Sequence, residues 1–319
     1  MNPDLLRPRV MLKTIQTKDF EVFSAAQHGW QICYRPVRPE RFESNMVSAY
    51  DREIQVDLEV WRNPLEITGT APRDALSLVL PLSDSNNYVS GGLKVTTEHI
   101  DLFGPGCEVF ALMKQQTSLM ALSIPIEALE RRADLPAAMV VAEYAEGHKV
   151  VSTTSQAAED LRQWGAGLQQ RFKHHPIPDE TYDQLFDETL LVIARALQSM
   201  KEDPDKSFQR RFDLARRARE YMLERRSCPP AISEICAFLK ISERTLHNAF
   251  SDTYQVSPKR FLKTQRLIAM HQELKSGVAS ANVTDIATRE GFSSLGYFAR
   301  YYQAMFGELP SETLRRRSA

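Results

Sequence analysis

An internal repeat near the carboxyl end of this 319-residue chain is the feature that most constrains its fold. Residues 231–236 match residues 282–287 at an offset of 51. Beyond the next turn, Leu246 matches Phe298 and Phe250 matches Tyr302 at an offset of 52. One inserted residue in the second turn accounts for the change, so the segment contains two copies of one structural unit.

Each copy has the pattern of a helix-turn-helix unit. In the first copy, Ile232 and Ile235 point inward from a short helix, and a tight turn follows. Ser242 stands where its hydroxyl caps the amino end of a second helix. Leu246 and Phe250, at i and i+4, share one face of that helix, so the opposite face is free to meet another molecule.

The second copy repeats this pattern and is joined to the first by a predicted helix over residues 258–276. Gly291 ends its first helix as a C′ glycine does, whereas the first copy has Lys240 in that place. Ser294 occupies the cap position of its second helix. A continuous helix between the copies holds two recognition helices apart, which suits two successive major grooves about 34 Å apart.

The two copies resemble the AraC/XylS family of bacterial transcription regulators, through residues 242–267 and 285–310. The resemblance implies a DNA-binding domain at 209–319, with one helix-turn-helix at about 231–254, a linker helix at 258–276 and another helix-turn-helix at about 283–306. The sequence departs from the family pattern at four positions, where glycine, serine, phenylalanine and Ser or Thr are usual: Gln255, Gly296, Tyr302 and Leu309.

The family's DNA contacts, carried onto matching positions, fall on both recognition helices. They are Ser242, Arg244, His247 and Asn248 in the first, and Leu295, Gly296, Ala299, Arg300 and Gln303 in the second. Arg244, His247 and Asn248 also share one helix face by spacing alone. Arginine pairs with guanine and asparagine with adenine in the major groove. The second helix is expected to read bases through Arg300 and Gln303, since Leu295 and Ala299 offer only apolar contacts.

Charge divides unevenly along the chain, although the net charge is −1. Residues 206–319 carry 20 Lys and Arg against 11 Asp and Glu, and the remainder is acidic. A basic segment is typical of nucleic-acid binding because it neutralises phosphates. A polar, proline-containing stretch at 201–208 is the predicted linker between the acidic and basic parts.

The first 200 residues have strand patterns followed by helical ones. Residues 53–60 alternate polar and apolar, which predicts a strand with one buried face, the apolar one. Residues 155–172 and 179–200 read as two long helices. We expect an α+β multidomain protein, with a cupin-like β-barrel and helical hairpin at 1–200. The apolar stripe of the second helix either packs on this barrel or forms a dimer seam.

Four aromatic residues are candidate contacts for a small effector inside the expected barrel: Trp30, Tyr34, Trp61 and Tyr88. Arg35 and Arg38 are available for an anionic ligand. Metal-dependent cupins use an HxH pair, which this sequence lacks. No catalytic residue, metal or cofactor is therefore expected.

These features predict a cytoplasmic, sequence-specific transcription regulator, an activator by resemblance. Its expected partners are promoter DNA, RNA polymerase, a second copy bound through the amino-terminal domain, and a small-molecule effector, but no membrane. One alternative is a cupin-type enzyme or ligand-binding protein fused to a DNA-binding domain. Another is a regulator that responds to a protein partner, which a filled barrel with an exposed apolar surface would favour.

Overall fold

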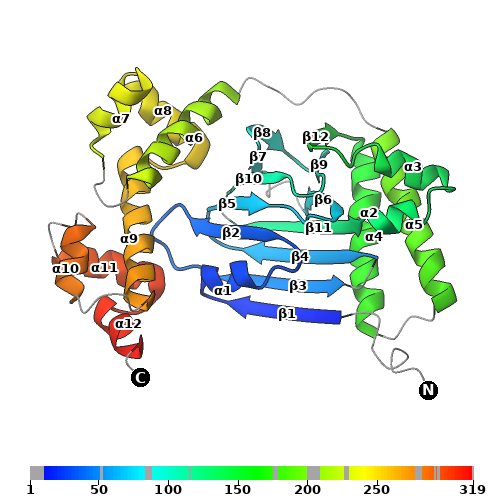
Figure 1. Cartoon of the computed structure of the whole chain (residues 1–319), viewed down its shortest axis with the longest axis horizontal. Coiled ribbons are helices and arrows are strands. Elements are labelled where there is room, and N and C mark those ends of the chain that lie inside the picture. Colours follow the sequence, from blue (N-terminus) through cyan, green and yellow to red (C-terminus); the bar gives the residue numbers. More distant parts are fainter. Residues whose placement is uncertain are drawn as a thin grey trace. The chain divides into compact units, whose positions relative to one another are not determined.

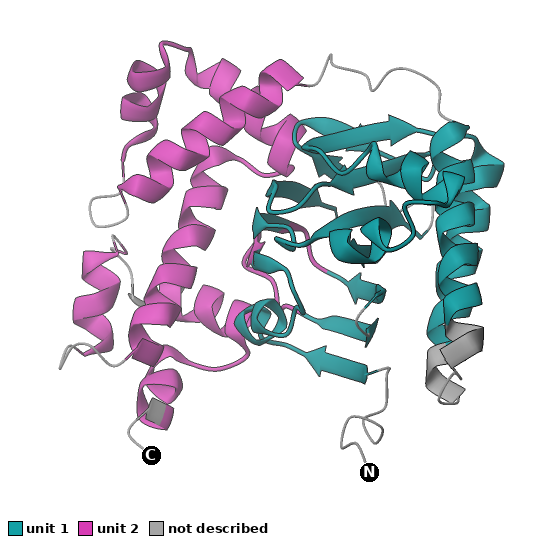
Figure 2. Cartoon of the chain, turned by 45° about the vertical axis from the view of Figure 1, so that its right-hand side comes forward, with its two compact units in different colours: residues 1–34, 43–62, 66–205 teal, residues 35–42, 63–65, 206–319 magenta. Residues whose placement is uncertain are grey.

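The chain forms two compact units, shown in different colours in Figure 2. Unit 1 comprises residues 1–34, 43–62 and 66–205, and unit 2 comprises 35–42, 63–65 and 206–319. The computed structural model describes residues 11–50, 53–82, 88–114, 116–174, 179–199, 209–225, 230–276, 282–290, 292 and 295–317. The predicted linker at 201–208 lies outside these described residues.

Unit 1 contains two β-sheets (Figure 1). In order across the first sheet, the strands are β1 (Met11–Thr17), β3 (Ser44–Tyr50), β4 (Gln55–Trp61), β11 (Thr117–Pro125), β6 (Ala75–Pro81), β9 (His99–Phe103) and β12 (His148–Ser152). The second sheet runs β2 (Gln31–Pro36), β5 (Leu65–Thr70), β10 (Glu108–Met113), β7 (Tyr88–Ser90) and β8 (Leu93–Val95). The expected barrel is therefore not closed, because each sheet ends in edge strands that do not pair across.

Strand β4 has the predicted alternation, but the prediction that only its apolar face is core was wrong. The polar side chains Asp57 and Glu59 are 1% and 4% exposed, whereas Val60 on the other face is 46% exposed. The apolar face, through Val56, joins the core beneath the helices. The polar face and Trp61 are buried as well, so β4 has a buried side chain on both faces.

The helices of unit 1 among its described residues are α1 (Phe20–Ala25), α2 (Ile126–Glu130), α3 (Pro136–Ala142), α4 (Ser155–His174) and α5 (Asp179–Gln198). Helix α4 contacts β3, β4 and β11. The stripe of α5, which includes Phe186, Leu190 and Ile193, is buried in a core shared with β6, β11 and α3. The stripe therefore packs within its own unit.

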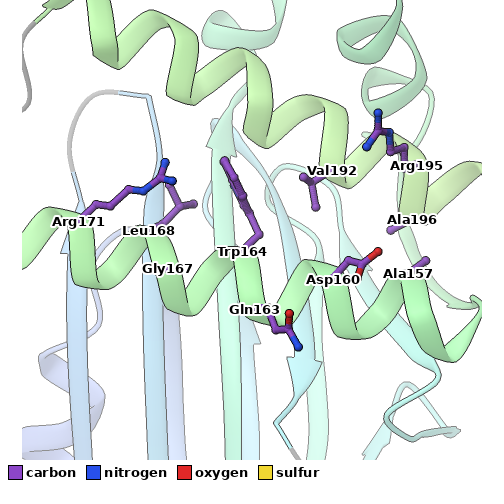
Figure 3. Close-up of a pocket in the computed structure, with 10 residues that line it drawn as sticks. All are labelled: Ala157, Asp160, Gln163, Trp164, Gly167, Leu168, Arg171, Val192, Arg195 and Ala196. Atoms are coloured by element: carbon purple, nitrogen blue, oxygen red, sulfur yellow. The ribbon is translucent and has the colours of Figure 1, made fainter.

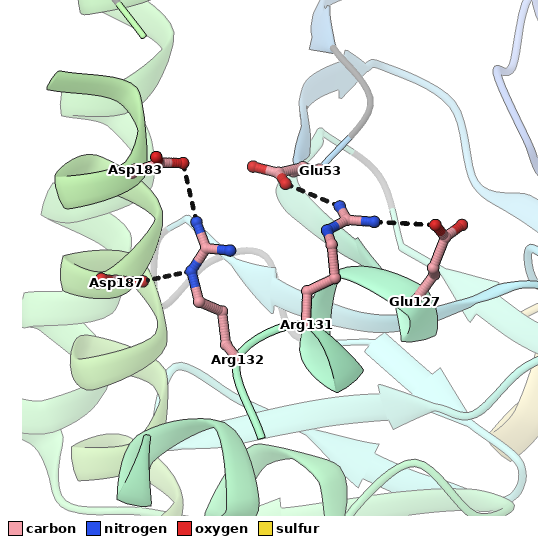
Figure 4. A network of polar contacts seen from close by, with 6 residues as sticks. All are labelled: Glu53, Glu127, Arg131, Arg132, Asp183 and Asp187. Atoms are coloured by element: carbon pink, nitrogen blue, oxygen red, sulfur yellow. Dashed lines mark hydrogen bonds and ion pairs between the residues drawn. The ribbon is translucent and has the colours of Figure 1, made fainter. Parts of the chain in front are cut away.

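Two adjacent arginines tie α2 and the turn after it to neighbouring elements (Figure 4). Arg132 donates to Asp187 and Asp183 on α5, each at 2.9 Å. Its guanidinium also lies 5.2 Å from the ring centre of Phe186. Arg131, directly after α2, pairs with Glu53 at 2.7 Å and with Glu127 of α2 at 3.0 Å. The Arg132 contacts hold α5 against the turn that follows α2.

Unit 2 is helical, with α6 (Gln209–Glu224), α7 (Ile232–Leu239), α8 (Glu243–Tyr254), α9 (Pro258–Ser276), α10 (Val283–Arg289), α11 (Leu295–Phe306) and α12 (Pro310–Arg317). The predicted continuous helix over 258–276 is confirmed as α9. Its buried residues include Phe261, Leu267 and Leu274. Helix α8 contacts α6, and α9 contacts α10 and α12. Within the described ranges of the chain, no helix has the length and hydropathy of a membrane span.

Candidate nucleic-acid interface and internal cavity

The first helix-turn-helix is formed by α7 and α8. Lys240 ends α7 with φ 55° and ψ 47°, the left-handed conformation that glycine usually adopts at a helix end. Ser242 caps α8, where its hydroxyl accepts a hydrogen bond from the Thr245 N–H at 3.1 Å. The sequence-predicted cap and turn thus lie at the expected positions, and they set the direction in which α8 leaves the turn.

Helix α8 presents one buried and one exposed face. Leu246, Ala249 and Phe250 are each at most 1% exposed. The candidate contacts Arg244, His247 and Asn248 are all exposed. His247 Nδ1 lies 3.4 Å from the Ser251 hydroxyl, one turn further along the helix. The three side chains are therefore accessible together on a helix whose other face anchors it.

The second helix-turn-helix is formed by α10 and α11. Asn282 caps α10 by accepting a hydrogen bond from the Asp285 N–H at 2.9 Å. On α11, Arg300 and Gln303 are exposed and Ala299 is half-buried, whereas Phe298 and Tyr302 are 2% and 0% exposed.

Several positions of the second unit lie outside the description. Leu295 and Gly296 begin α11, but their side chains are not described, and Gly291 and the predicted cap Ser294 lie outside the described residues.

The structure describes the surroundings of three of the four departures from the family pattern: Tyr302, Leu309 and Gln255. The Tyr302 hydroxyl lies 2.6 Å from His271 Nδ1 on α9 and 2.8 Å from the Thr313 hydroxyl on α12. A phenylalanine has no hydroxyl for this buried chain of hydrogen bonds. Leu309 cannot cap α12 by its side chain, and the Glu312 carboxylate accepts from the Leu309 N–H at 2.7 Å instead. Gln255 has φ 55°, which explains why glycine is usual there.

The four aromatic residues expected to meet an effector line one internal cavity of unit 1, with a volume of about 40 Å³. Trp30, Tyr34, Trp61 and Tyr88 are all buried, with exposures of 8% or less. Arg35 and Arg38 are absent from the cavity wall, so they do not supply the expected anion contact. A volume of this size holds only a few water molecules. The interior is thus closely packed but not fully filled.

Two tyrosine–carboxylate pairs cross from one sheet to the other at this cavity. Tyr34 on β2 donates to Glu59 on β4 at 2.7 Å. Tyr88 on β7 donates to Asp101 on β9 at 2.9 Å. Burial raises the pKa of Glu59 to about 8, and burial together with these carboxylates raises the pKa of both tyrosines. Glu59 and Asp101 were not predicted from the sequence. The only indication for Glu59 was that it lies on the same face of β4 as the aromatic residue Trp61.

His148 extends the second pair but does not form a catalytic triad with it. Its Nε2 lies 2.7 Å from Asp101 Oδ1 and 3.1 Å from the Ser90 hydroxyl. A Ser-His-Asp relay needs the serine and the carboxylate on opposite ring nitrogens, and here both meet the same one. Among the residues that the structure describes, no cluster of His, Cys, Asp and Glu has the arrangement of a metal site.

The exposed recognition helices define a protein of the helix-turn-helix class, and comparisons agree. Residues 235–316 match the family model described as a helix-turn-helix domain. The chain is 34% identical over 86 residues to the XylDLEGF operon transcriptional activator of Pseudomonas putida, covering 27% of each protein. The chain thus spans about a quarter of the length of the curated relatives it matches.

Two solved structures are also similar. A probable AraC family transcriptional regulator from Rhodopseudomonas palustris CGA009 is 40% identical over 33% of this chain and 97% of that chain, with a TM-score of 0.32. The AraC-like transcriptional activator CuxR is 12% identical over 88% of this chain and 100% of that chain, with a TM-score of 0.46. Residues 235–316 thus form a helix-turn-helix domain of the kind found in AraC/XylS transcription regulators.

Proposed function

We propose that this chain is a sequence-specific DNA-binding transcription regulator in which α8 and α11 enter the major groove. The observation that carries this proposal is the exposed group Arg244, His247 and Asn248, on a helix that is capped at Ser242 and anchored by its buried face. A helix held in this way presents its side chains to base edges at low entropic cost. The basic composition of residues 206–319 supports attraction to phosphates.

Each exposed side chain has a proposed role. Arg244 donates two hydrogen bonds to guanine O6 and N7, Asn248 pairs with adenine N6 and N7, and His247 contacts phosphate. On α11, Arg300 and Gln303 read bases and Ala299 contacts a thymine methyl group. Leu295 and Gly296, at the start of α11, lie along the groove with them.

Arg244→Ala tests base reading by α8. Loss of one bidentate pair should weaken binding to a specific duplex by about 1–3 kcal/mol, or roughly 5- to 150-fold, and should relax the preference at one base pair. Titration of the full chain against specific and random duplexes measures both effects. Arg289→Ala, which removes an exposed arginine from α10, is the matched control and should leave the ratio of the two affinities unchanged. An equal loss of affinity for the specific and the random duplex in Arg244→Ala would contradict the base-reading role.

Activation is a further part of the proposal, supported by relatives that are named as transcriptional activators. Contact with RNA polymerase and response to an effector are proposed from the resemblance to the AraC/XylS family. A homodimer through the amino-terminal unit would place four recognition helices on two half-sites. The groove between α4 and α5, with a volume of about 440 Å³, is the surface we propose for this contact (Figure 3). Trp164, Val192 and Arg195 line it, and Leu191 on α5 is 43% exposed.

A further inference from the structure

The second recognition helix, α11, is held within unit 2 by polar contacts as well as by packing. The Tyr302 hydroxyl on α11 lies 2.6 Å from His271 Nδ1 on α9 and 2.8 Å from the Thr313 hydroxyl on α12. Tyr302, His271 and Thr313 are buried, with exposures of 0%, 7% and 4% respectively. One oxygen atom of α11 therefore joins this helix to two neighbouring helices inside the core.

This chain of hydrogen bonds, which we call the α11 relay, ends at a carboxylate. The Thr313 hydroxyl donates to Glu308 Oε1 at 2.6 Å, and Glu308 Oε2 lies 2.7 Å from Arg316 Nη1. A carboxylate that is paired with arginine is ionised, and it accepts hydrogen bonds without donating any. Thr313 has a single hydroxyl proton, so that proton goes to Glu308.

The direction of the other bonds in the relay follows and fixes a proton on His271. Because the Thr313 proton is committed to Glu308, the Thr313 oxygen accepts from the Tyr302 hydroxyl. The Tyr302 proton is then committed as well, so the Tyr302 oxygen accepts from His271, and Nδ1 is the ring nitrogen that carries a proton. The bonds of the relay all run towards the carboxylate, and bonds aligned in this way polarise and strengthen one another.

The relay constrains α11 differently from the aromatic contacts beside it. Phe306 stacks on His271 with ring centres 3.9 Å apart, and Lys263 Nζ lies 3.4 Å from the ring centre of Tyr301. These contacts hold α11 against α9, but stacked rings and a cation over a ring keep contact when one partner slides or turns. Hydrogen bonds weaken steeply when their distance or angle changes. The relay therefore fixes the rotation of α11 about its own axis.

We propose that Tyr302 is a positioning residue for sequence reading by α11. Arg300 and Gln303, the proposed base contacts, are exposed on the same helix within two positions of Tyr302. Side chains that make such contacts must be held within about 0.5 Å and 10–20° of their productive geometry. This inference rests on the proposed function, because it names what sets the specificity of the second recognition helix. The phenylalanine that is usual in the resembled family has no hydroxyl, so this positioning is a feature of this chain.

Tyr302→Phe tests the proposal, because it removes the hydroxyl and keeps the ring. The full chain is titrated against duplexes altered in one block of the selected motif at a time; the α11 block is the one whose preference Arg300→Ala removes. Tyr302→Phe should lose at least about fivefold of the preference for the α11 block and should keep the preference for the other block. Thr313→Val, which keeps the shape of the side chain without its hydroxyl, should have the same effect. Thr313→Ser, which keeps the hydroxyl, should behave as the wild type.

Two further measurements separate positioning from a loss of stability. Met305→Leu is the matched control, because it changes a side chain of α11 that is 2% exposed and leaves the relay intact. This variant should keep the preference for both blocks, whatever protection from hydrogen exchange α11 loses. Nitrogen NMR of the histidine rings at pH 8, with His271 assigned by its loss in His271→Asn, should show a proton on Nδ1 in the wild type. The ring should populate both neutral tautomers in Tyr302→Phe.

Three results would overturn the inference: an unchanged preference for the α11 block in Tyr302→Phe and Thr313→Val, an equal loss of this preference in Met305→Leu, or a neutral His271 ring protonated at Nε2 in the wild type. Binding of the wild type to specific and random duplexes is measured in the same series. If the wild type prefers the specific duplex and Tyr302→Phe matches it in both blocks, only the positioning role falls. If the wild type shows no preference, the proposed function falls.

Discussion

Phe250→Ala should destabilise unit 2 by about 3–5 kcal/mol, because it opens a cavity under the first recognition helix. Phe250 is fully buried, and its ring centre lies 5.1 Å from that of Tyr254 and 5.5 Å from that of Phe261 on α9. The same three rings join the recognition helix to the linker helix. Loss of this contact should therefore also abolish DNA binding by the first helix-turn-helix.

Hydrogen exchange of the full chain measures this effect locally. Peptides from α8 and α9 should lose about 10²- to 10⁴-fold of their protection from exchange, while peptides from unit 1 should keep theirs. Phe238→Ala is the matched control, since it removes the same side chain from a position on α7 that is 53% exposed. The control should change stability by less than about 1 kcal/mol. Unchanged protection in Phe250→Ala would show that α8 is not held by this cluster.

Glu59→Gln should remove a large pH dependence from the stability of unit 1. The pKa of Glu59 is about 8 in the folded chain, above the value of 4.5 for an ordinary glutamate. Between pH 4.5 and pH 8 the folded state therefore binds more protons than the unfolded state. The free energy of unfolding falls as the pH rises through this range. The pKa of Asp57 is about 6, and burial lowers the pKa of His28 and His99, so the Glu59 contribution is taken as the difference between wild type and variant. This difference should change by about 2–3 kcal/mol from pH 6 to 8.

Denaturant unfolding followed by tryptophan fluorescence reports on unit 1 alone, since the three tryptophans are Trp30, Trp61 and Trp164. The difference between wild type and Glu59→Gln should widen in favour of the variant from pH 6 to pH 8. Glu108→Gln, which changes an exposed carboxyl on β10, should follow the wild-type curve. Parallel curves for wild type and Glu59→Gln would mean that Glu59 is ionised throughout, contrary to the effect of its burial.

The helix-turn-helix elements were predictable from sequence because their determinants are local. Pro258 begins α9 and Ser242 caps α8, and both positions follow from side-chain chemistry at helix ends. Leu246 and Phe298 occupy equivalent positions in the two copies of the repeat, and this equivalence identified the buried face of each recognition helix. The base-reading roles of Arg244 and Arg300 stay predictions, as do the domain boundaries.

The interior of unit 1 was harder to predict because it depends on contacts between distant strands. The alternation of polar and apolar residues along β4 predicted a strand. It did not predict the burial of Glu59, because its hydrogen-bond partner Tyr34 comes from the other sheet. Closure of a barrel depends on the pairing of edge strands, which no local pattern encodes. His148 pairs with Asp101 across 47 positions of sequence and was missed for the same reason.

Selection of bound sequences from random duplex oligonucleotides, with the full chain and with the double variant Arg244→Ala, Arg300→Ala, tests the central claim most directly. Arg62→Ala with Arg131→Ala, in unit 1, controls for the loss of two positive charges. The wild type and the control should recover a motif with two informative blocks about one helical turn apart, and the double variant should lose both blocks. Recovery of only sequence-independent, salt-sensitive binding by the wild type would contradict a two-unit reader.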